Sequence, residues 1–435
     1  MKYGPDDRPP FFKLCLYGLQ WWVVAMPCVL VTGLVVARLH HPGDGASQIV
    51  YLGKLFALTG ALSVAQVLWG HRLPLIIGPA TVLLVGIVAS QAAGPSAIYT
   101  SVFLGGCAMA AFTTVGFFTR IRDFFTPRIV AVILILISFT LSPTILRLST
   151  DHLGGGGAWG LVFALCLMLA LVAINDRLPG AWKAVTLLLG IGLGTPAHIL
   201  LFGYTAPAAF DAVGLSTVRP PLAFAVEPGT LLAFLFCFLA LTINELGSIE
   251  AVGRILGAGS MDSRLRMGTR VCGFGNMASG TVGVIGSVDF SLSAGIIMAT
   301  GCASRYPMVP MGILLSLCAL FPKLIVVMAM IPNPVMGSIL LYTMVSQLAS
   351  GLTGITGPRG VTDFRTGNVV ALPLMAGLLI AFTPVEAFAA FPAILRPVLG
   401  NGFVMGTLLV LALEHLVLRQ GKGEAAAKAP TNEKP

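Results

Sequence analysis

The stretch that decides the fold covers residues 273–305, GFGNMASGTVGVIGSVDFSLSAGIIMATGCASR. It is too apolar for a surface loop, yet glycine, serine and threonine interrupt it more often than in a lipid-facing helix. One acid, Asp289, lies near its middle. An ionisable side chain at membrane depth costs about 3 kcal/mol on insertion scales. Irregular backbone at that depth is stable only where protein or a water-filled cavity satisfies its polar groups. The stretch therefore predicts a functional site inside a membrane protein.

The composition supports this interpretation. The chain has 435 residues, of which 56% are hydrophobic and 10% charged, whereas soluble proteins carry about 25% charged residues. The net charge of +9 comes from basic residues that stand between apolar runs, so we expect no nucleic-acid partner. The eight cysteines show no metal-binding spacing, and we expect no metal, cofactor or disulfide. We expect an all-α polytopic membrane protein.

Apolar runs of about 20 residues mark the candidate membrane spans. Fourteen such ranges can be assigned, and the third and tenth are interrupted by proline, glycine or serine. The ranges are 14–38, 49–70, 74–91, 97–119, 129–147, 158–175, 182–204, 229–248, 270–286, 288–303, 308–331, 335–351, 369–388 and 401–418.

The placement of lysine and arginine predicts the orientation. With the N-terminus inside, only six of the 26 basic residues fall outside or within the membrane, and these are Arg38, Lys54, Arg147, Arg219, Lys323 and Arg396. Such a bias is typical of inside loops. We therefore expect a multi-pass inner-membrane protein with both termini in the cytoplasm. Residues 250–270, with Arg254, Arg264 and Arg266, are expected to form an amphipathic cytoplasmic piece.

The chain divides into two halves of seven spans. Because seven is odd, the second half enters the membrane from the opposite side, which predicts two inverted repeats with a site where their broken spans meet at the midplane. The predicted parts are a cytoplasmic N-terminus at 1–13, a first repeat at 14–205, an outer linker at 206–228, a second repeat at 229–418 and a disordered cytoplasmic tail at 419–435.

Several motifs resemble those of the nucleobase–ascorbate transporter family, which includes the uracil and xanthine permeases. The densest match begins at Gly295, where four residues separate the glycine from Thr300-Gly301-Cys302-Ala303-Ser304-Arg305. Other matching motifs are Gly18-Leu19-Gln20-Trp21, Gly247-Ser248-Ile249-Glu250-Ala251, Phe321-Pro322-Lys323 and Ile331-Pro332-Asn333-Pro334-Val335-Met336-Gly337.

The resemblance implies a secondary active transporter that carries a nucleobase such as uracil or xanthine in symport with a proton. It further implies a core around the third and tenth spans, a gate formed by the remaining spans, alternating access and a homodimer. No catalytic constellation is present, so we do not expect an enzyme.

The chain departs from the family pattern where the substrate is held. Asn244 stands at the place of the family's acidic ligand, and Leu292 at the place of a Gln or Glu in the tenth-span signature. Ser293 replaces the asparagine that follows, and Trp21 replaces a first-span histidine. These departures leave the identity of the substrate open.

The predicted substrate site is nevertheless suited to a flat base. The Asn244 amide both donates and accepts, and Ser248 lies one helical turn further on the same face. Ser291 and Ser293 would offer donors at a helix start, and Leu292 would make the pocket drier. The residues expected to cover the ring or to line the first broken span are Phe290, Trp21 and Thr81. Asparagine and serine also bridge neighbouring membrane helices, and Trp21 could instead anchor the helix at the membrane interface.

Two acids are candidates for proton coupling. Asp289 lies at the break beside the expected substrate and is the preferred residue. Glu245 lies about 100° round the helix from Asn244 and could instead pair with a basic group of the scaffold.

Two alternative functions remain open. The first is a carrier of another small planar or anionic solute, because sulfate-type anion carriers share this architecture. The second is a channel or receptor, which would conduct or bind without concentrating its ligand.

Overall fold

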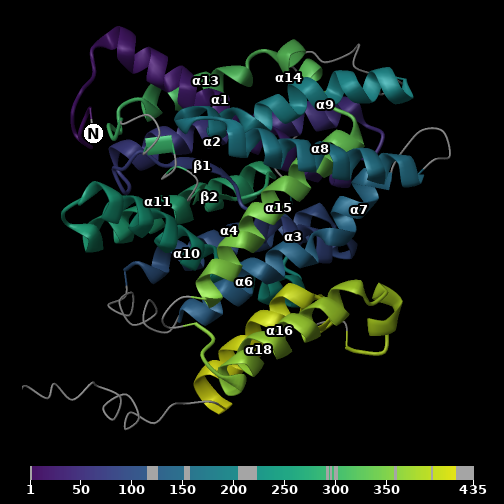
Figure 1. Ribbon diagram of the computed structural model, residues 1–435. Coiled ribbons are helices and arrows are strands. Elements are labelled where there is room, and N and C mark those ends of the chain that lie inside the picture. Colours follow the sequence, from purple (N-terminus) through teal and green to yellow (C-terminus); the bar gives the residue numbers. More distant parts are fainter. Residues whose placement is uncertain are drawn as a thin grey trace, which may run out of the picture.

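The computed structural model describes residues 2–114, 126–150, 157–203, 223–290, 293, 296–297, 302–356, 360–392 and 395–417. Helices make up nearly all of this part, as predicted, and two short strands lie among them (Figure 1). Most of the outer linker predicted at 206–228, and the whole predicted tail at 419–435, lie outside the described residues.

The first part of the chain forms mostly long helices. Its elements are α1 (Phe11–His40), α2 (Gly45–Leu68), β1 (Ile76–Pro79), α3 (Thr81–Ala89), the 3₁₀ turn η1 (Gln91–Ala93), α4 (Gly94–Phe112), α6 (Pro127–Thr140), α7 (Ser142–Thr150), α8 (Gly157–Arg177), the 3₁₀ turn η2 (Gly180–Val185) and α9 (Thr186–Phe202).

The second part of the chain also consists of helices of varied length and contains one short strand. Its elements are α10 (Pro228–Leu256), α11 (Met261–Val282), β2 (Ser287–Phe290), α13 (Met308–Cys318), α14 (Pro322–Ala329), α15 (Asn333–Ile355), α16 (Phe364–Phe382), the 3₁₀ turn η3 (Val385–Phe388), α17 (Arg396–Leu399), α18 (Gly402–Ala412) and the π-helical turn η4 (Leu413–Val417).

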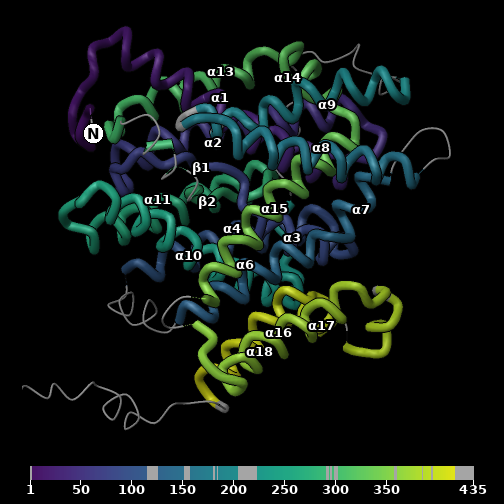
Figure 2. The backbone as a smooth tube through the Cα atoms, viewed as in Figure 1, coloured from purple at the N-terminus to yellow at the C-terminus, as the bar shows by residue number. Residues whose placement is uncertain are grey.

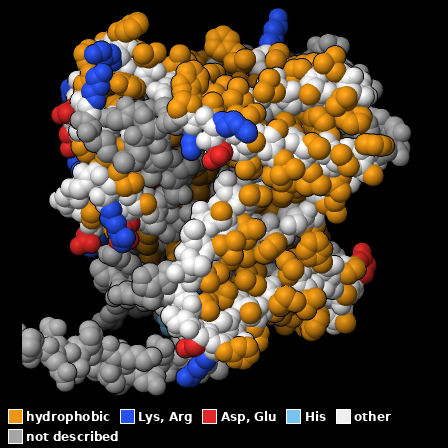
Figure 3. Space-filling model, viewed as in Figure 1, with side chains coloured by type: hydrophobic (Ala, Val, Ile, Leu, Met, Phe, Trp, Pro, Cys, Tyr) orange, Lys and Arg blue, Asp and Glu red, His pale blue; other side chains and the backbone are white. Residues whose placement is uncertain are grey.

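Eight of the described helices are long and apolar enough to cross a membrane. The pair α13 and α14, bent by 87° at its break, would make a ninth, broken span. Apolar side chains cover much of the visible surface in Figure 3, and Leu169, Leu200 and Leu379 are all exposed. An apolar exterior of this kind is suited to lipid. The remaining predicted ranges fall on shorter or more polar elements, so the count of fourteen spans stays a prediction.

Proline and glycine set the break before α3. Pro74 and Pro79 cannot donate backbone hydrogen bonds, which disfavours helix across residues 74–79. Residues 76–79 instead form β1, which pairs antiparallel with β2 in the register Ile76↔Phe290 and Pro79↔Ser287. The breaks predicted in the third and tenth spans are therefore two strands that satisfy each other's backbone groups.

The helices pack in matching pairs across the two halves. α2 lies against α13, and α11 lies against α4; likewise α1 contacts α13 as α10 contacts α4. A second group forms around α6 and α15, with α8 and α9 on α15 and α16 and α18 on α6. In Figure 1, α16 and α18 lie at the bottom of the view and α13 and α14 at the top.

The prediction for residues 250–270 needs correction. α10 continues to Leu256 and α11 begins at Met261, so only a short turn with left-handed residues Gly257 and Ser260 separates them. The apolar pattern does not indicate where these two helices end and begin, because their facing ends are charged.

The first residues of the chain lie along the end of the tenth predicted span and the residues just after it (Figure 2). Tyr3 forms a parallel bridge with Cys302, and the backbone N–H of Arg305 donates to the Pro5 carbonyl. Arg305 also forms an ion pair with Asp6 at 3.0 Å. These contacts join the N-terminus to one end of the helices around the strands.

Candidate functional site

The two strands present different side chains on their two faces. Side chains alternate along a strand, so Phe290 and Gly78 share one face of the pair, and Asp289 and Ile77 share the other. The Phe290 ring lies so close to Gly78 that a Cβ added there would be 2.6 Å from the ring. Any larger residue at this position would have to displace the half-buried ring, which covers the first strand.

The opposite face carries a buried acidic cluster, which we define as Gln66, His71, Glu245 and Asp289. His71 Nε2 lies 3.2 Å from Asp289 Oδ2, and both side chains have no exposed surface. The backbone N–H of Asp289 donates to Glu245 Oε2 at 2.8 Å. Gln66 Nε2 donates to Glu245 Oε1 at 3.3 Å and to the Gly268 carbonyl at 2.9 Å. The cluster thus joins α2, the turn before β1, α10 and β2.

The chemistry of the cluster favours a bound proton. Two carboxyl groups removed from water repel each other when both are ionised, and one imidazole compensates at most one of them. Neither carboxylate oxygen of Asp289 accepts an aligned hydrogen bond from the described residues. Groups coupled in this way take up and release protons as a unit rather than singly.

Asn276 fixes the beginning of β2. Its Oδ1 accepts from the Ser287 N–H at 3.0 Å, and its Nδ2 donates to the Ser287 carbonyl at 3.0 Å. The amide side chain therefore satisfies both backbone groups of Ser287, as a neighbouring strand would. Cys272 Sγ, one turn earlier on α11, contacts the same carbonyl at 3.3 Å.

The predicted substrate residues lie in several places. Asn244 is half-buried on α10, and Ser248 is 1% exposed with a hydroxyl that has no described hydrogen-bond partner. Ser293 is buried, where it accepts from the Ile76 N–H at 2.9 Å and donates to the Phe290 carbonyl at 2.8 Å. Trp21 is 1% exposed within α1.

Ser291 and Leu292 lie outside the described residues. Thr81, at the start of α3, donates to Gln347 Oε1 of α15 across 3.5 Å. Thr81 thus connects the helices around the strands with the second group of helices.

Four residues of this region were not identified from the sequence: Gln66, His71, Asn276 and Gln347. Each is a polar residue within or beside an apolar run, which is the one signal that could have drawn attention to them. Among the described residues, no group of three or more His, Cys, Asp and Glu is arranged to hold a metal ion.

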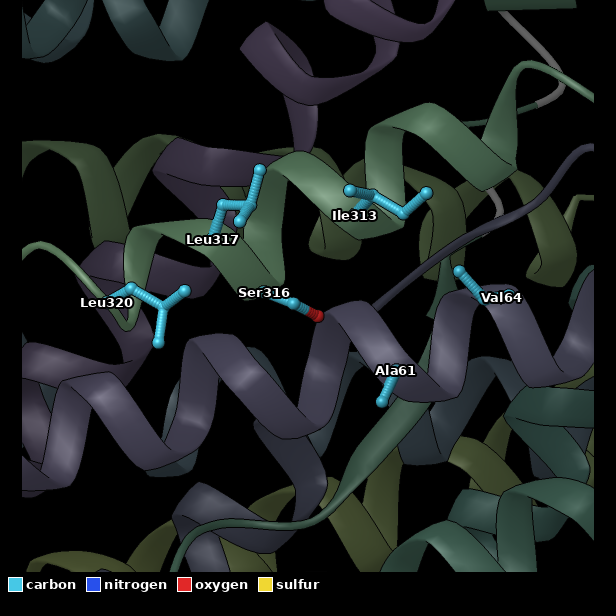
Figure 4. Close-up of a pocket in the computed structure, with 6 residues that line it drawn as sticks. All are labelled: Ala61, Val64, Ile313, Ser316, Leu317 and Leu320. Carbon is cyan, nitrogen blue, oxygen red and sulfur yellow. The ribbon is translucent and has the colours of Figure 1, made fainter.

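An apolar groove of about 520 Å³ lies elsewhere, between α2 and α13 (Figure 4). Its lining includes the exposed side chains of Ile313, Leu317 and Leu320. Ser316 in the groove donates to the Ala57 carbonyl. None of the site residues lines it, and its apolar, open form is suited to lipid.

Comparison with known proteins gives concordant results. A family model described as "Permease family" (Xan_ur_permease) matches residues 12–386. A putative purine permease of Clostridium perfringens is 27% identical over 95% of this chain and 92% of its own length. The uric acid transporter UacT of Escherichia coli is 24% identical over 92% of this chain and 85% of its own.

The fold is similar to solved structures of transporters. The transmembrane domain of the cyanobacterial bicarbonate transporter BicA matches with a TM-score of 0.61 at 18% identity, over 85% of this chain and 95% of that one. The murine Slc26a9 anion transporter matches with a TM-score of 0.59 at 12% identity, over 92% of this chain and 68% of that one. At these identities the likeness concerns the fold alone.

Proposed function

The chain belongs to the xanthine–uracil permease family, and from that premise we propose that it carries a purine-type nucleobase in symport with a proton. Membership of a permease family makes it a multi-pass membrane transporter and not an enzyme. The observation that carries the coupling proposal is the contact of three buried titratable groups, His71, Glu245 and Asp289, behind the paired strands.

The substrate class follows from the relatives and the neutral polar groups of the site. The relatives are named for purines, uric acid and xanthine. The edge of an oxopurine alternates N–H donors with carbonyl acceptors, which the amides of Asn244 and Gln347 and the hydroxyl of Thr81 can complement. Phe290, on the face of the strands away from Asp289, supplies an apolar surface for the ring.

We assign fourteen spans in two inverted seven-span repeats, at 14–205 and 229–418. Support comes from the antiparallel pairing of β1 with β2 and from the matched packing of α2 on α13 and α11 on α4. Helices around the strands would form the core, and those around α6 and α15 the gate. Movement of the core against the gate would expose the site to each side in turn.

Thr81 and Gln347 face each other across this proposed boundary. A bound base between them would replace the hydrogen bond that Thr81 and Gln347 make to each other. The charge distribution of the loops supports cytoplasmic termini in the inner membrane, and a homodimer through the gate remains part of the proposal.

Reconstituted protein tests the proposed substrate. Proteoliposomes with an acidic exterior are expected to concentrate labelled xanthine or urate and to lose the accumulation when an ionophore collapses the pH gradient. Uracil, sulfate and bicarbonate form the comparison panel. Accumulation of sulfate or bicarbonate without any purine or pyrimidine would support the alternative of an anion carrier, which the fold of BicA and Slc26a9 favours. Equilibration without accumulation would support a channel.

The variant Asp289→Asn tests the coupling. It should reduce pH-driven accumulation at least about tenfold while leaving exchange between labelled and unlabelled base, since exchange needs no net proton movement. The matched control is Asp262→Asn, which removes an exposed acid in the first turn of α11. Unchanged uptake with an unchanged pH dependence in Asp289→Asn would exclude Asp289 as the coupling residue.

A further inference from the structure

His71 is the only imidazole of the acidic cluster, and it stands at the entry to β1. It lies in the turn between α2 and β1, one residue before the exposed Arg72, and its side chain is completely buried. Its Nε2 is 3.2 Å from Asp289 Oδ2. A buried histidine in contact with a buried carboxyl group influences which groups of the cluster are charged.

Three hydrogen bonds fix the residue. The Leu73 N–H donates to Nδ1 at 2.9 Å, the His71 N–H donates to Gln66 Oε1 at 3.4 Å, and Arg264 Nη1 donates to the His71 carbonyl at 2.9 Å. Because Nδ1 accepts a hydrogen bond, the neutral ring carries its proton on Nε2. The N–H group is thus on the nitrogen that lies beside Asp289.

The two acids of the cluster differ in their surroundings. Both oxygens of Glu245 accept hydrogen bonds, one from the Asp289 backbone and one from Gln66. The oxygens of Asp289 accept no aligned hydrogen bond from the described residues, and the His71 ring and the Glu245 carboxyl group both interact with them. A donor that contacts a carboxylate favours its ionised form, so the His71 N–H beside Asp289 Oδ2 favours ionised Asp289.

We infer that His71 is a positioning residue for coupling, which holds Asp289 as the acid that readily gives up the transported proton. The inference rests on the proposed function, because it names the residue that sets the pH range in which the cluster releases its proton. When Asp289 carries the proton, its attraction to His71 weakens. The turn that leads into β1 is then less firmly held to β2.

Other titratable and polar groups surround His71 and Asp289. Among the described residues, α10 contributes Glu245, α11 contributes Arg264 and Cys272, and the turn itself contributes Arg72, while α2 contributes only the neutral Gln66. Arg264 contacts the backbone carbonyls of His71 and Arg72 rather than the carboxylates. Substitution of His71 keeps these backbone carbonyls, so Arg264 can keep both contacts in the His71 variants.

The test compares the pH profiles of xanthine and urate uptake. Without the N–H donor, Asp289 keeps its proton to higher pH, so the alkaline midpoint of uptake should rise by about one pH unit in His71→Leu. His71→Gln restores a donor and should recover at least half of this shift. The control His41→Leu makes the same change in the loop after α1 and should keep the wild-type midpoint. A lower rate with an unchanged midpoint in His71→Leu would show a structural role only and overturn the inference.

A second measurement needs no substrate. Infrared titration of the purified protein can follow the protonated carboxyl band that disappears in Asp289→Asn. This band should persist about one pH unit higher in His71→Leu than in wild type, and His71→Gln should again recover at least half of the shift. If wild type accumulates none of the panel solutes, the proposed function fails, yet this titration still decides the role of His71. Identical titration of wild type and both His71 variants would overturn the inference.

Discussion

Two buried polar clusters flank the residues that lead into and form β2, and they differ in charge. The acidic cluster contains two carboxyl groups and one imidazole. The other, which we call the tyrosine cluster, consists of His40, Tyr51 and Tyr99. Tyr99 Oη lies 2.9 Å from His40 Nδ1 and donates to Tyr51 Oη at 3.2 Å, and the Ile285 N–H donates to Tyr51 Oη at 2.9 Å.

The comparison shows that burial of polar groups does not by itself identify a coupling site. The phenols of the tyrosine cluster are neutral and form hydrogen bonds with one another and with the backbone, which is what a stable buried network needs. The acidic cluster leaves the Asp289 oxygens without an aligned donor among the described residues. Only a cluster whose charge changes can connect proton binding with movement.

The largest effect is expected from Glu245→Leu. This change leaves the Asp289 N–H without its acceptor and the Gln66 amide with only the Gly268 carbonyl, so pH-driven uptake should fall about 100-fold and the free energy of unfolding by about 3 kcal/mol. Uptake assays and thermal denaturation in detergent measure the two effects. Glu250→Leu, on the same helix with an exposed ion pair to Arg254, is the control and should change stability by less than about 1 kcal/mol. Equal losses in both variants would contradict a special role for the acidic cluster.

A smaller effect is expected from Gly78→Ala on the other face of the strands. The new methyl group would overlap the Phe290 ring and displace it, which should weaken substrate affinity about tenfold without moving the pH midpoint of uptake. Concentration-dependent uptake at several pH values separates the two outcomes. Gly192→Ala on α9, where no atom lies within 4 Å of the added Cβ, is the matched control. A shifted pH midpoint in Gly78→Ala would mean that the two faces are not independent.

Tyr99→Phe probes the tyrosine cluster. Loss of the hydroxyl removes the link between His40 and Tyr51, so the free energy of unfolding should fall by about 1 kcal/mol. The pH profile of uptake should stay the same, because no group that changes charge during transport is lost. A displaced profile would show that the tyrosine cluster also takes part in coupling.

The smallest effect is expected from Asp6→Asn at the N-terminus. The ion pair with Arg305 is largely exposed on the aspartate side, and such pairs contribute about 0.2–1 kcal/mol. Thermal stability at low and high salt measures the contribution, which should vanish at high salt. Loss of transport would instead assign the N-terminal segment a functional role.

Local composition was sufficient to predict much of the architecture. The sequence predicts the breaks at 74–79 and near Asp289, because closely spaced proline, glycine and serine residues disfavour helix there. The family was recognised from short motifs such as Ala303-Ser304-Arg305, and the family match confirms it. The start of α11 was missed, since its first turns are polar and give no apolar signal.

The sequence by itself determined that this is a membrane protein with interrupted apolar segments, because apolar runs and their interruptions are properties of neighbouring residues, and its short motifs indicated the permease family. The tertiary structure alone decided which buried polar groups meet. Gln66 and Glu245 contact each other although 179 positions separate them, and His71 reaches Asp289 only because the turn before β1 is held beside β2. Contacts between distant segments depend on the packing of whole helices, which leaves no local pattern in the chain.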